Sequence, residues 1–355
     1  RRRYRARHYE DRVRVAKALM PDGALGADVI VGFPGETEAE FEENRRFIES
    51  LPFTYLHVFT YSERPGTPAA GMPGPARANH AAPGFKTVLR KALIAGVADD
   101  ATCERIAKAG FPGVELMEKK VTIAQAAQGR ATAEKHGLKI HSFMGGWADF
   151  NNADEAARRR SIDDVKRLID VTAAYGADAI LLVPCRVGGA MPRPAEFKID
   201  FDPQTLAVKA VVAGDNAPFA AYIAAHNRAT ELSRAAVEEL IPAAAAANVT
   251  IALENVWNNL WVLPDFAAAF VRSFKSKQVR AYLDLGNHVR YAPTEQWLRT
   301  LGADIVKLHI KDFKIDREKK NDGEFVPIGK GSIDWVSVRR VIDEIGYSGW
   351  VTIES

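Results

Sequence analysis

Residues 251–258 read IALENVWN, an apolar run that ends on a glutamate, Glu254. The same arrangement occurs three more times along the chain, in AYLDLGNH (281–288), VKLHIKD (306–312) and VTIES (351–355). Short apolar runs of this kind are typical of parallel strands, which are covered on both faces. We therefore predict four buried strands, each with a polar side chain at its carboxyl end.

Strands and helices are predicted to alternate throughout residues 85–355. The predicted strands are Val88–Ala95, Gly113–Met117, Lys139–Phe143, Ala179–Pro184, Thr250–Glu254, Arg280–Leu285, Ile305–Ile310 and Trp350–Glu354. The predicted helices are Asp99–Ala109, Ile123–His136, Ala156–Tyr175, Phe219–Ala247, Leu263–Ser276, Thr294–Leu301 and Asp334–Ile345. Eight strands with seven helices between them indicate an α/β fold, the (β/α)₈ or TIM barrel. A doubly wound sheet is the alternative, but no glycine-rich phosphate turn follows the first strand.

The pattern calls for an eighth helix after the eighth strand, and the sequence stops before it. We therefore expect a barrel that lacks its last helix. Because terminal residues are poorly held unless they are tied down, Glu354 is expected to be the least firmly placed of the strand-end residues.

The first 70 residues are predicted to be an incomplete α/β fragment. Its helices are Tyr9–Met20 and Thr37–Leu51, and its strands are Ala27–Gly32 and Tyr55–Tyr61. Thr37 and Glu40 have the spacing of a capping box. Two strands cannot bury a sizeable core. Residues 71–84, rich in Pro, Gly and Ala, are predicted to link this fragment to the barrel of residues 85–355.

The composition narrows the class of protein. The chain is 47% hydrophobic and 26% charged with a net charge of +3, so no strong field points to a nucleic-acid or membrane partner. No apolar run of about 18 residues occurs, and we expect no membrane span. Cys103 and Cys185 are too far apart for a disulfide framework or a cysteine metal cluster, which suits a reducing, cytoplasmic location.

In TIM barrels the active site lies at the carboxyl ends of the strands. Strands five to eight place Glu254, Asp284, His309 and Glu354 there. Taken singly, such residues are more often core histidines, helix caps or solvated carboxylates. Unpaired carboxylates beside apolar strands, however, cost several kcal/mol in lost solvation, and a shared cation removes that cost for all of them. This oxygen-rich set therefore predicts a site for Mn²⁺, Mg²⁺ or Co²⁺.

Four further residues are predicted to contact the substrate, namely His141, Asn255, His288 and Lys330. For the two histidines a hydrogen-bonded place in the core is the alternative. Lys330 lies in the loop PIGKGSIDW, where it either meets a substrate phosphate or is solvated. Lys311 is expected to point to the other side of its strand from His309, and Asp312 to cap a helix or loop.

Residues 85–355 resemble the sugar phosphate isomerase/epimerase family, whose barrel is like that of xylose isomerase. The order Glu, Asp, His, Glu in ALENVWN, YLDLGNH, KLHIKD and TIES is typical of it, as is the ending GKGSIDW…IGYSGWVTIE. The resemblance implies that the four strand-end residues bind one divalent cation, most often Mn²⁺, with Mg²⁺, Co²⁺ or Zn²⁺ as alternatives. It also implies that Glu254 and Glu354 are the acid/base pair acting on a keto sugar or sugar phosphate through an enediolate.

The sequence departs from the ketose 3-epimerases of that family at two places. Leu260 stands where they commonly carry a substrate-binding Glu, and Asn287, followed by His288, stands where they carry His. Sugar recognition is therefore expected to differ from theirs. The long loop of residues 186–218 is expected to form part of a substrate lid.

The first block resembles another family. GADVIVGFPGETEAEFEE (26–43) and FTYLHVFTYSERPGTPAA (53–70) are similar to radical SAM methylthiotransferases that modify tRNA. The Cys-x-x-x-Cys-x-x-Cys motif of that family is absent, so we expect no functional iron–sulfur cluster. We interpret the block as an inactive remnant joined by gene fusion or assembly error.

The sequence is compatible with four functions. The leading prediction is a metal-dependent isomerase or epimerase with a small carbohydrate substrate. A keto-sugar or inosose lyase or dehydratase would use the same barrel. A hydrolase of the endonuclease IV type would need several more histidines. An RNA-binding fusion would use the arginine-rich start of the chain, although a solvated helix face is favoured there. No membrane or nucleic-acid partner is expected, and a homo-oligomer is left open.

Overall fold

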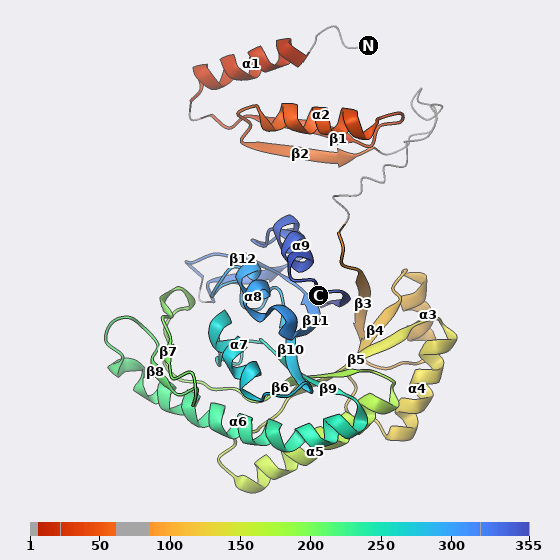
Figure 1. Cartoon of the computed structure of the whole chain (residues 1–355), viewed down its shortest axis with the longest axis vertical. Coiled ribbons are helices and arrows are strands. Elements are labelled where there is room, and N and C mark those ends of the chain that lie inside the picture. Colours follow the sequence, from red (N-terminus) through yellow and green to blue (C-terminus); the bar gives the residue numbers. More distant parts are fainter. Residues whose placement is uncertain (1–5, 22, 62–84, 320, 355) are drawn as a thin grey trace. The chain divides into compact units, whose positions relative to one another are not determined.

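A computed structural model describes residues 6–21, 23–61, 85–319 and 321–354 (Figure 1). The chain divides into two compact units, residues 1–85 and residues 86–355. The predicted linker, residues 71–84, lies outside the described residues. Within the described residues, no helix has both the length and the apolar character that a membrane crossing requires.

The second unit is a closed barrel of eight parallel strands, in the order β10-β11-β14-β3-β4-β5-β6-β9. The strands are β3 (Leu89–Ala95), β4 (Gly113–Leu116), β5 (Lys139–Trp147), β6 (Ala179–Val183), β9 (Thr250–Glu254), β10 (Val279–Asp284), β11 (Ile305–Ile310) and β14 (Gly349–Ile353). The last strand closes the barrel against the first, with Thr352 beside Ala92. The predicted TIM barrel is confirmed.

Seven helices of this unit lie outside the barrel and follow the strands in sequence (Figure 1). They are α3 (Asp100–Lys108), α4 (Ile123–Lys135), α5 (Glu155–Ala174), α6 (Ala220–Ala247), α7 (Pro264–Ser273), α8 (Thr294–Leu301) and α9 (Trp335–Glu344). Several begin at a side-chain cap: Asp99, Thr122, Asp154 and Asp334 each accept a backbone N–H of the first turn. Such caps satisfy amides that a helix end leaves unpaired.

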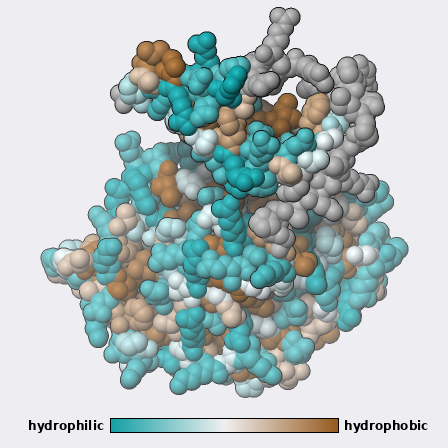
Figure 2. Space-filling view, turned by 45° about the horizontal axis from the view of Figure 1, so that its top comes forward, coloured by the Kyte–Doolittle hydropathy of each residue, from teal (hydrophilic) through white to brown (hydrophobic). Residues whose placement is uncertain are grey.

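The interior of the barrel contains both apolar and polar buried side chains. Strands β6 and β9 contribute buried Leu181, Val183 and Ala252. Strands β4 and β11 contribute buried Glu115 and His309. By contrast, the face of the molecule in Figure 2 is largely hydrophilic, with hydrophobic residues scattered over it. Polar groups enclosed in this way are costly unless they serve one another or a ligand.

Strand β5 is longer than the sequence predicts and continues past Phe143 to Trp147. Its register against β6 shifts between Met144 and Gly146. A Cβ on Gly145 would lie 2.8 Å from the backbone oxygen of Leu181, so glycine permits the close approach of the two strands. Gly145 and Gly146, which follow the predicted end of the strand at Phe143, therefore lie at a bulge within it.

Two hairpins at this unit were not predicted: β7 (Asp200–Phe201) with β8 (Val208–Ala210), and β12 (Asp312–Ile315) with β13 (Gly323–Val326). The first lies within the long loop of residues 186–218. That loop is fastened to the second hairpin, because Arg193 Nη2 lies 2.8 Å from Oδ1 of buried Asp322. Arg317 binds the other oxygen of Asp322, also at 2.8 Å. Strands of two to four residues are too short to show a sequence period.

The first unit contains α1 (Ala6–Leu19), β1 (Gly26–Val31), α2 (Glu38–Glu49) and β2 (Tyr55–Thr60), with β1 and β2 paired in parallel. The predicted capping box of Thr37 and Glu40 is confirmed at the start of α2. Ile30, Val58 and Phe59 are exposed on this two-stranded sheet. Within residues 6–61, as described, the sheet has no third strand, which agrees with the predicted incomplete fragment.

Candidate metal centre

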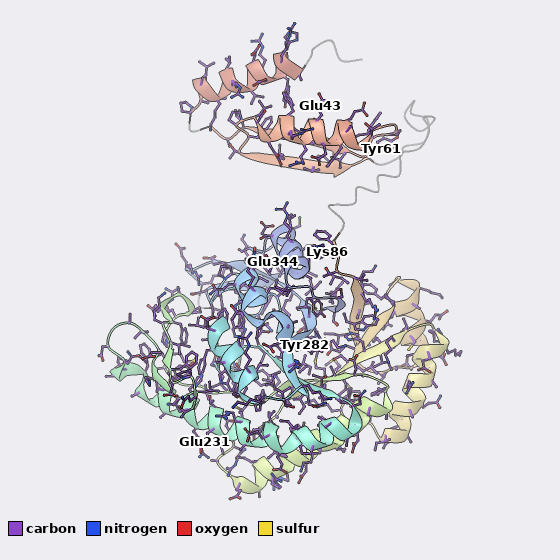
Figure 3. The ribbon with its side chains drawn as sticks, in the orientation of Figure 1. Glu43, Tyr61, Lys86, Glu231, Tyr282 and Glu344 are labelled. Carbon is purple, nitrogen blue, oxygen red and sulfur yellow. The ribbon has the colours of Figure 1, made fainter. Side chains whose placement is uncertain are left out.

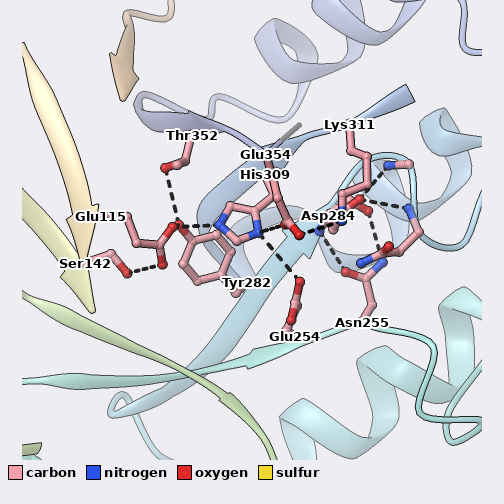
Figure 4. A network of polar contacts seen from close by, with 12 residues as sticks. Glu115, Ser142, Glu254, Asn255, Tyr282, Asp284, His309, Lys311, Thr352 and Glu354 are labelled. Carbon is pink, nitrogen blue, oxygen red and sulfur yellow. Dashed lines mark hydrogen bonds and ion pairs between the residues drawn. The ribbon is translucent and has the colours of Figure 1, made fainter. Parts of the chain in front are cut away.

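Four side chains meet at the carboxyl ends of β9, β10, β11 and β14 (Figure 4). Glu254, Asp284, His309 and Glu354 each offer one ligand atom, and these atoms lie within 4.8 Å of one another. His309 Nδ1 is 3.0 Å from Glu354 Oε2 and 3.6 Å from Glu254 Oε1. The structure thus brings together the four predicted ligands. That they hold a metal ion remains a prediction.

Three of the atoms in this group are buried without a well-formed hydrogen bond to any described residue. They are Asp284 Oδ2, His309 Nδ1 and Glu354 Oε2. Their contacts are ion pairs within the group and with Lys311, so these buried atoms keep unused capacity to bind a ligand. Clustered carboxylate oxygens and an imidazole nitrogen are the ligands that a divalent cation takes from a protein. The residues present therefore fit such a cation.

The two glutamates of the group have opposite electrostatic surroundings. Burial raises the pKa of Glu254, whose side chain is 8% exposed. Burial also acts upward on Glu354, but His309 and Lys311 outweigh it and lower the pKa of Glu354 to about 2. The imidazole itself is buried, which disfavours its charge, yet Glu115, Glu254 and Glu354 raise the pKa of His309 well above its ordinary value. One carboxylate is thus held ionised by neighbouring cations, and the other mainly experiences burial.

Lys311 joins the site, and the expectation that it points away from His309 is wrong. Its Nζ lies 2.7 Å from Glu354 Oε1 and 3.4 Å from Asp284 Oδ2. Lys311 follows His309 by two positions, and strand side chains alternate with a period of two, so both face the barrel interior. The side chain of Glu354 is therefore held by Lys311. The backbone N–H of Glu354 also donates a hydrogen bond to Ile310 O at 3.1 Å.

The turn after β10 holds Asp284 in place. Asp284 Oδ1 accepts hydrogen bonds from the backbone N–H groups of Gly286, at 2.7 Å, and Asn287, at 2.8 Å. The Asn255 amide spans the Asp284 backbone: its Oδ1 accepts from Asp284 N at 2.7 Å, and its Nδ2 donates to Asp284 O at 3.2 Å. These bonds favour a positioning role for Asn255, and its predicted substrate contact remains a prediction.

Residues 103–355 match the family described as xylose isomerase-like TIM barrel. The chain belongs to this family. Among solved structures, the xylose isomerase domain protein from Planctomyces limnophilus is 17% identical, with a TM-score of 0.57 over 76% of this chain and 92% of that one. D-psicose 3-epimerase, solved with D-fructose, is 16% identical, with a TM-score of 0.55 over 75% and 84%. The 3-keto-D-glucoside 4-epimerase YcjR of E. coli is 15% identical, with a TM-score of 0.55 over 76% and 92%. At these identities the likeness shows the fold.

The N-terminal stretch matches other proteins. It is similar to the tRNA-2-methylthio-N(6)-dimethylallyladenosine synthase of Saccharopolyspora erythraea, 49% identical over 74 residues, which are 21% of this chain and 15% of that protein. It is also similar to the threonylcarbamoyladenosine tRNA methylthiotransferase MtaB of Bacillus subtilis, 53% identical over 72 residues, or 20% and 16%. The chain thus spans about a sixth of the length of these relatives.

The two histidines predicted to contact substrate, His141 and His288, are not among the four candidate metal ligands. His141 is buried inside the barrel, with Nε2 3.0 Å from Thr352 Oγ1 and its ring stacked on Trp350 at 4.8 Å. His288 is buried, with its ring stacked on Tyr291 at 5.2 Å. The hydrogen bond of His141 favours the core alternative for that residue. Both ring nitrogens of His288 are buried without a well-formed hydrogen bond to a described residue, so its surroundings do not favour a hydrogen-bonded core role. Contact with a substrate remains a prediction for each.

Lys330 is exposed in a loop that Asp312 holds. Asp312 Oδ2 accepts hydrogen bonds from the N–H groups of Gly329, at 2.8 Å, and Gly331, at 3.0 Å. A Cβ on Gly331 would lie 1.9 Å from Asp312 Oδ1, so only glycine fits there. The prediction that Asp312 caps a loop is confirmed. The role of Lys330 toward a substrate phosphate remains a prediction.

Sequence reasoning missed Glu115, which lies on the far side of the His309 ring from the ligand group (Figure 4). It is fully buried in β4, and its Oε2 is 2.7 Å from His309 Nε2. The same oxygen accepts a hydrogen bond from the hydroxyl of Tyr282, a residue of β10 among the barrel strands (Figure 3). A signal was present, since Glu115 is a charge within the otherwise apolar run GVELM.

Proposed function

We propose that residues 86–355 form a divalent-metal-dependent isomerase or epimerase that acts on a keto sugar or sugar phosphate. The observation that carries this proposal is the convergence of four ligand atoms within 4.8 Å of one another, three of them buried without a well-formed hydrogen bond to a described residue. Membership of the xylose isomerase-like family supports it, as do structural neighbours that are named as sugar epimerases. The location at the strand carboxyl ends is where barrel enzymes act.

Glu254, Asp284, His309 and Glu354 would hold the cation, with Mn²⁺ as the leading candidate and Mg²⁺, Co²⁺ or Zn²⁺ as alternatives. When bound, it would act as a Lewis acid toward a carbonyl oxygen and its neighbouring hydroxyl, which acidifies the C–H between them. Three carboxylates and Lys311 carry a formal charge of −2 when His309 is neutral, which matches a divalent cation. The four ligands and Lys311 would then be neutral with the cation bound, and Glu115, 2.7 Å from His309, adds one further carboxylate beside them.

The two glutamates would carry the proton transfer. One removes the proton on carbon to give an enediolate, and the other returns it to the opposite face, which inverts that carbon. Return of the proton to the neighbouring carbon would instead interconvert ketose and aldose. The ammonium of Lys311, beside Glu354 and Asp284, lies where it can stabilise negative charge that develops on the sugar.

The experiment that tests the proposal is hydrogen exchange at carbon. Keto sugars, with and without phosphate, are incubated with the protein in deuterated water, and deuterium uptake is followed by NMR. We expect uptake that requires added metal and is lost in Glu254→Gln. Glu324→Gln, at an exposed glutamate of β13, is the matched control and should exchange normally. Full exchange by metal-free protein would contradict the proposal, and NMR of the products separates epimerisation from loss of water.

The endonuclease IV alternative has less support. That reaction type uses three zinc ions and several histidines, whereas the candidate metal group that the described residues form contains one, His309. His226 is buried with its ring stacked on Phe266, away from this group, and His141 and His288 are placed as described above. Incision of an abasic duplex would reverse this ranking.

A further inference from the structure

We propose that Glu115 is a positioning residue of the metal centre, whose buried carboxylate binds Nε2 of His309 and thereby directs the Nδ1 lone pair at the cation. The inference rests on the proposed function only in that it requires a cation at the four ligands. It concerns a residue outside the ligand set, on a strand that supplies none of the ligands.

Glu115 lies in the middle of β4, where all four residues are buried, and its exposed fraction is 0%. A buried carboxylate loses several kcal/mol of solvation, and apolar replacements of such groups are often neutral or stabilising. Stability alone therefore gives no reason for a glutamate here. A role in orienting another group does.

The contacts of Glu115 define that role. Its Oε2 lies 2.7 Å from His309 Nε2 and accepts a hydrogen bond from the Tyr282 hydroxyl at 2.9 Å. Its Oε1 accepts one from the Ser142 hydroxyl at 3.0 Å. The donors come from β11, β10 and β5, so the carboxylate is held from three directions. Both oxygens are engaged, which fixes the rotamer of Glu115.

The imidazole of His309 lies between Glu115 and the ligand group (Figure 4). When Nε2 carries the hydrogen and donates it to Glu115, Nδ1 has a free lone pair. That Nδ1 is the atom 3.0 Å from Glu354 Oε2 and 3.6 Å from Glu254 Oε1. A carboxylate on the second nitrogen of a ligating histidine fixes the tautomer and ring orientation and raises ligand basicity.

Further contacts keep this arrangement rigid. The Tyr282 ring lies 4.4 Å from the His309 ring, and its hydroxyl is 3.4 Å from Thr352 Oγ1. Thr352 in turn meets His141, which stacks on Trp350. These buried polar residues thus form one connected network that reaches the proposed metal centre at His309. This network gives buried His141 a structural reason to be there.

The first test is metal affinity, measured by electron paramagnetic resonance of free Mn²⁺ during titration of the full chain. Glu115→Gln keeps the shape and removes the charge, and we expect Mn²⁺ binding weaker by about 10- to 100-fold. Glu115→Ala should weaken it at least as much. Glu324→Gln is the matched control, because it makes the same change at an exposed glutamate of β13, so its affinity should stay that of wild type. Ser142→Ala, which removes one donor to Glu115 and leaves the His309 contact, should weaken binding less than Glu115→Gln. Wild-type affinity in both Glu115 variants would overturn the proposal.

A second test uses wild-type protein and so does not depend on any variant folding. Long-range ¹H–¹⁵N spectra of the protein loaded with diamagnetic Zn²⁺ report which imidazole nitrogen carries hydrogen. We expect hydrogen on Nε2 of His309 and metal on Nδ1; the reverse assignment, or an uncoordinated His309, overturns the proposal. Neither test needs a sugar. A protein that binds metal but exchanges no sugar hydrogen therefore contradicts the proposed function and leaves this inference standing.

Discussion

At the scale of single residues, Lys311 sets the charge of the site. Its ammonium contacts two proposed ligands, at 2.7 Å from Glu354 and 3.4 Å from Asp284. An ammonium at that distance opposes a divalent cation and also stabilises negative charge on a bound substrate. The first effect is measured as metal affinity and the second as the rate of hydrogen exchange at carbon, so variants of Lys311 can separate them.

Lys311→Met should therefore bind Mn²⁺ more tightly than wild type while exchanging substrate hydrogen more slowly, by on the order of 100-fold. Lys311→Arg keeps the charge and should retain much of the activity. Titration of metal and the deuterium exchange assay measure the two quantities. A variant that loses metal affinity and exchange together would show that Lys311 mainly holds the ligands in place.

We expect any metal binding at the four residues to depend on pH through His309. Despite burial, the surrounding carboxylates raise the pKa of His309 well above its ordinary value in the metal-free protein. The imidazole then holds a proton at neutral pH that a cation must displace. Apparent metal affinity should thus rise as pH rises toward that pKa and fall as pH falls. Calorimetry in buffers of different ionisation enthalpy should detect the released proton; a binding enthalpy independent of buffer would contradict this.

At the scale of elements, the turn after β10 connects the fold to the site. Asp284 depends on the N–H groups of Gly286 and Asn287, and the chain passes very close to the end of β11 there. A Cβ on Gly286 would lie 2.6 Å from the Lys311 backbone oxygen. The turn must therefore shift if this glycine is replaced.

Gly286→Ala should lower the free energy of unfolding by about 1–3 kcal/mol, as overpacking does, and weaken metal binding as well. Gly188→Ala is the control, since a Cβ there meets nothing within 4 Å. Differential scanning calorimetry of metal-free protein and Mn²⁺ titration provide the two readings. Equal behaviour of the two variants would mean that the turn tolerates the methyl group.

The elements also show what the sequence could predict. The strands of the barrel and the four converging residues could be predicted from apolar runs that end on a polar residue. Parallel strands place their carboxyl ends at the same edge of the barrel, so such end residues come together. The contact of Glu115 with His309 could not be predicted, since it joins residues 194 positions apart and depends on strand register. The side chain of Lys311 was predicted on the wrong face of its strand, because its separation from His309 is two positions and was counted as one. The two hairpins were missed because strands this short leave no periodic pattern.

At the scale of the whole molecule, every residue of the candidate metal centre lies in the unit of residues 86–355. Glu115, Lys311 and the supporting network lie in it as well. The unit of residues 1–85 carries exposed apolar residues on its two-stranded sheet and matches a small part of its curated relatives. We infer that the metal centre needs only the barrel.

A protein comprising residues 86–355 alone should therefore bind Mn²⁺ with the affinity of the full chain and unfold at a similar temperature. Residues 1–85 alone should not unfold cooperatively, because the two strands and two helices described within residues 6–61 bury little apolar surface. Circular dichroism during heating and Mn²⁺ titration test both statements. Loss of metal binding in the shortened protein would show that the first unit supports the barrel.

We propose that Glu254, Asp284, His309 and Glu354 bind one divalent cation. Titration of the full chain with Mn²⁺, followed by electron paramagnetic resonance, measures that binding without a substrate. The predicted result is one tight site per chain, lost in Asp284→Asn and kept in Glu324→Gln. The absence of a tight site in wild-type protein, or an undiminished site in Asp284→Asn, would contradict it.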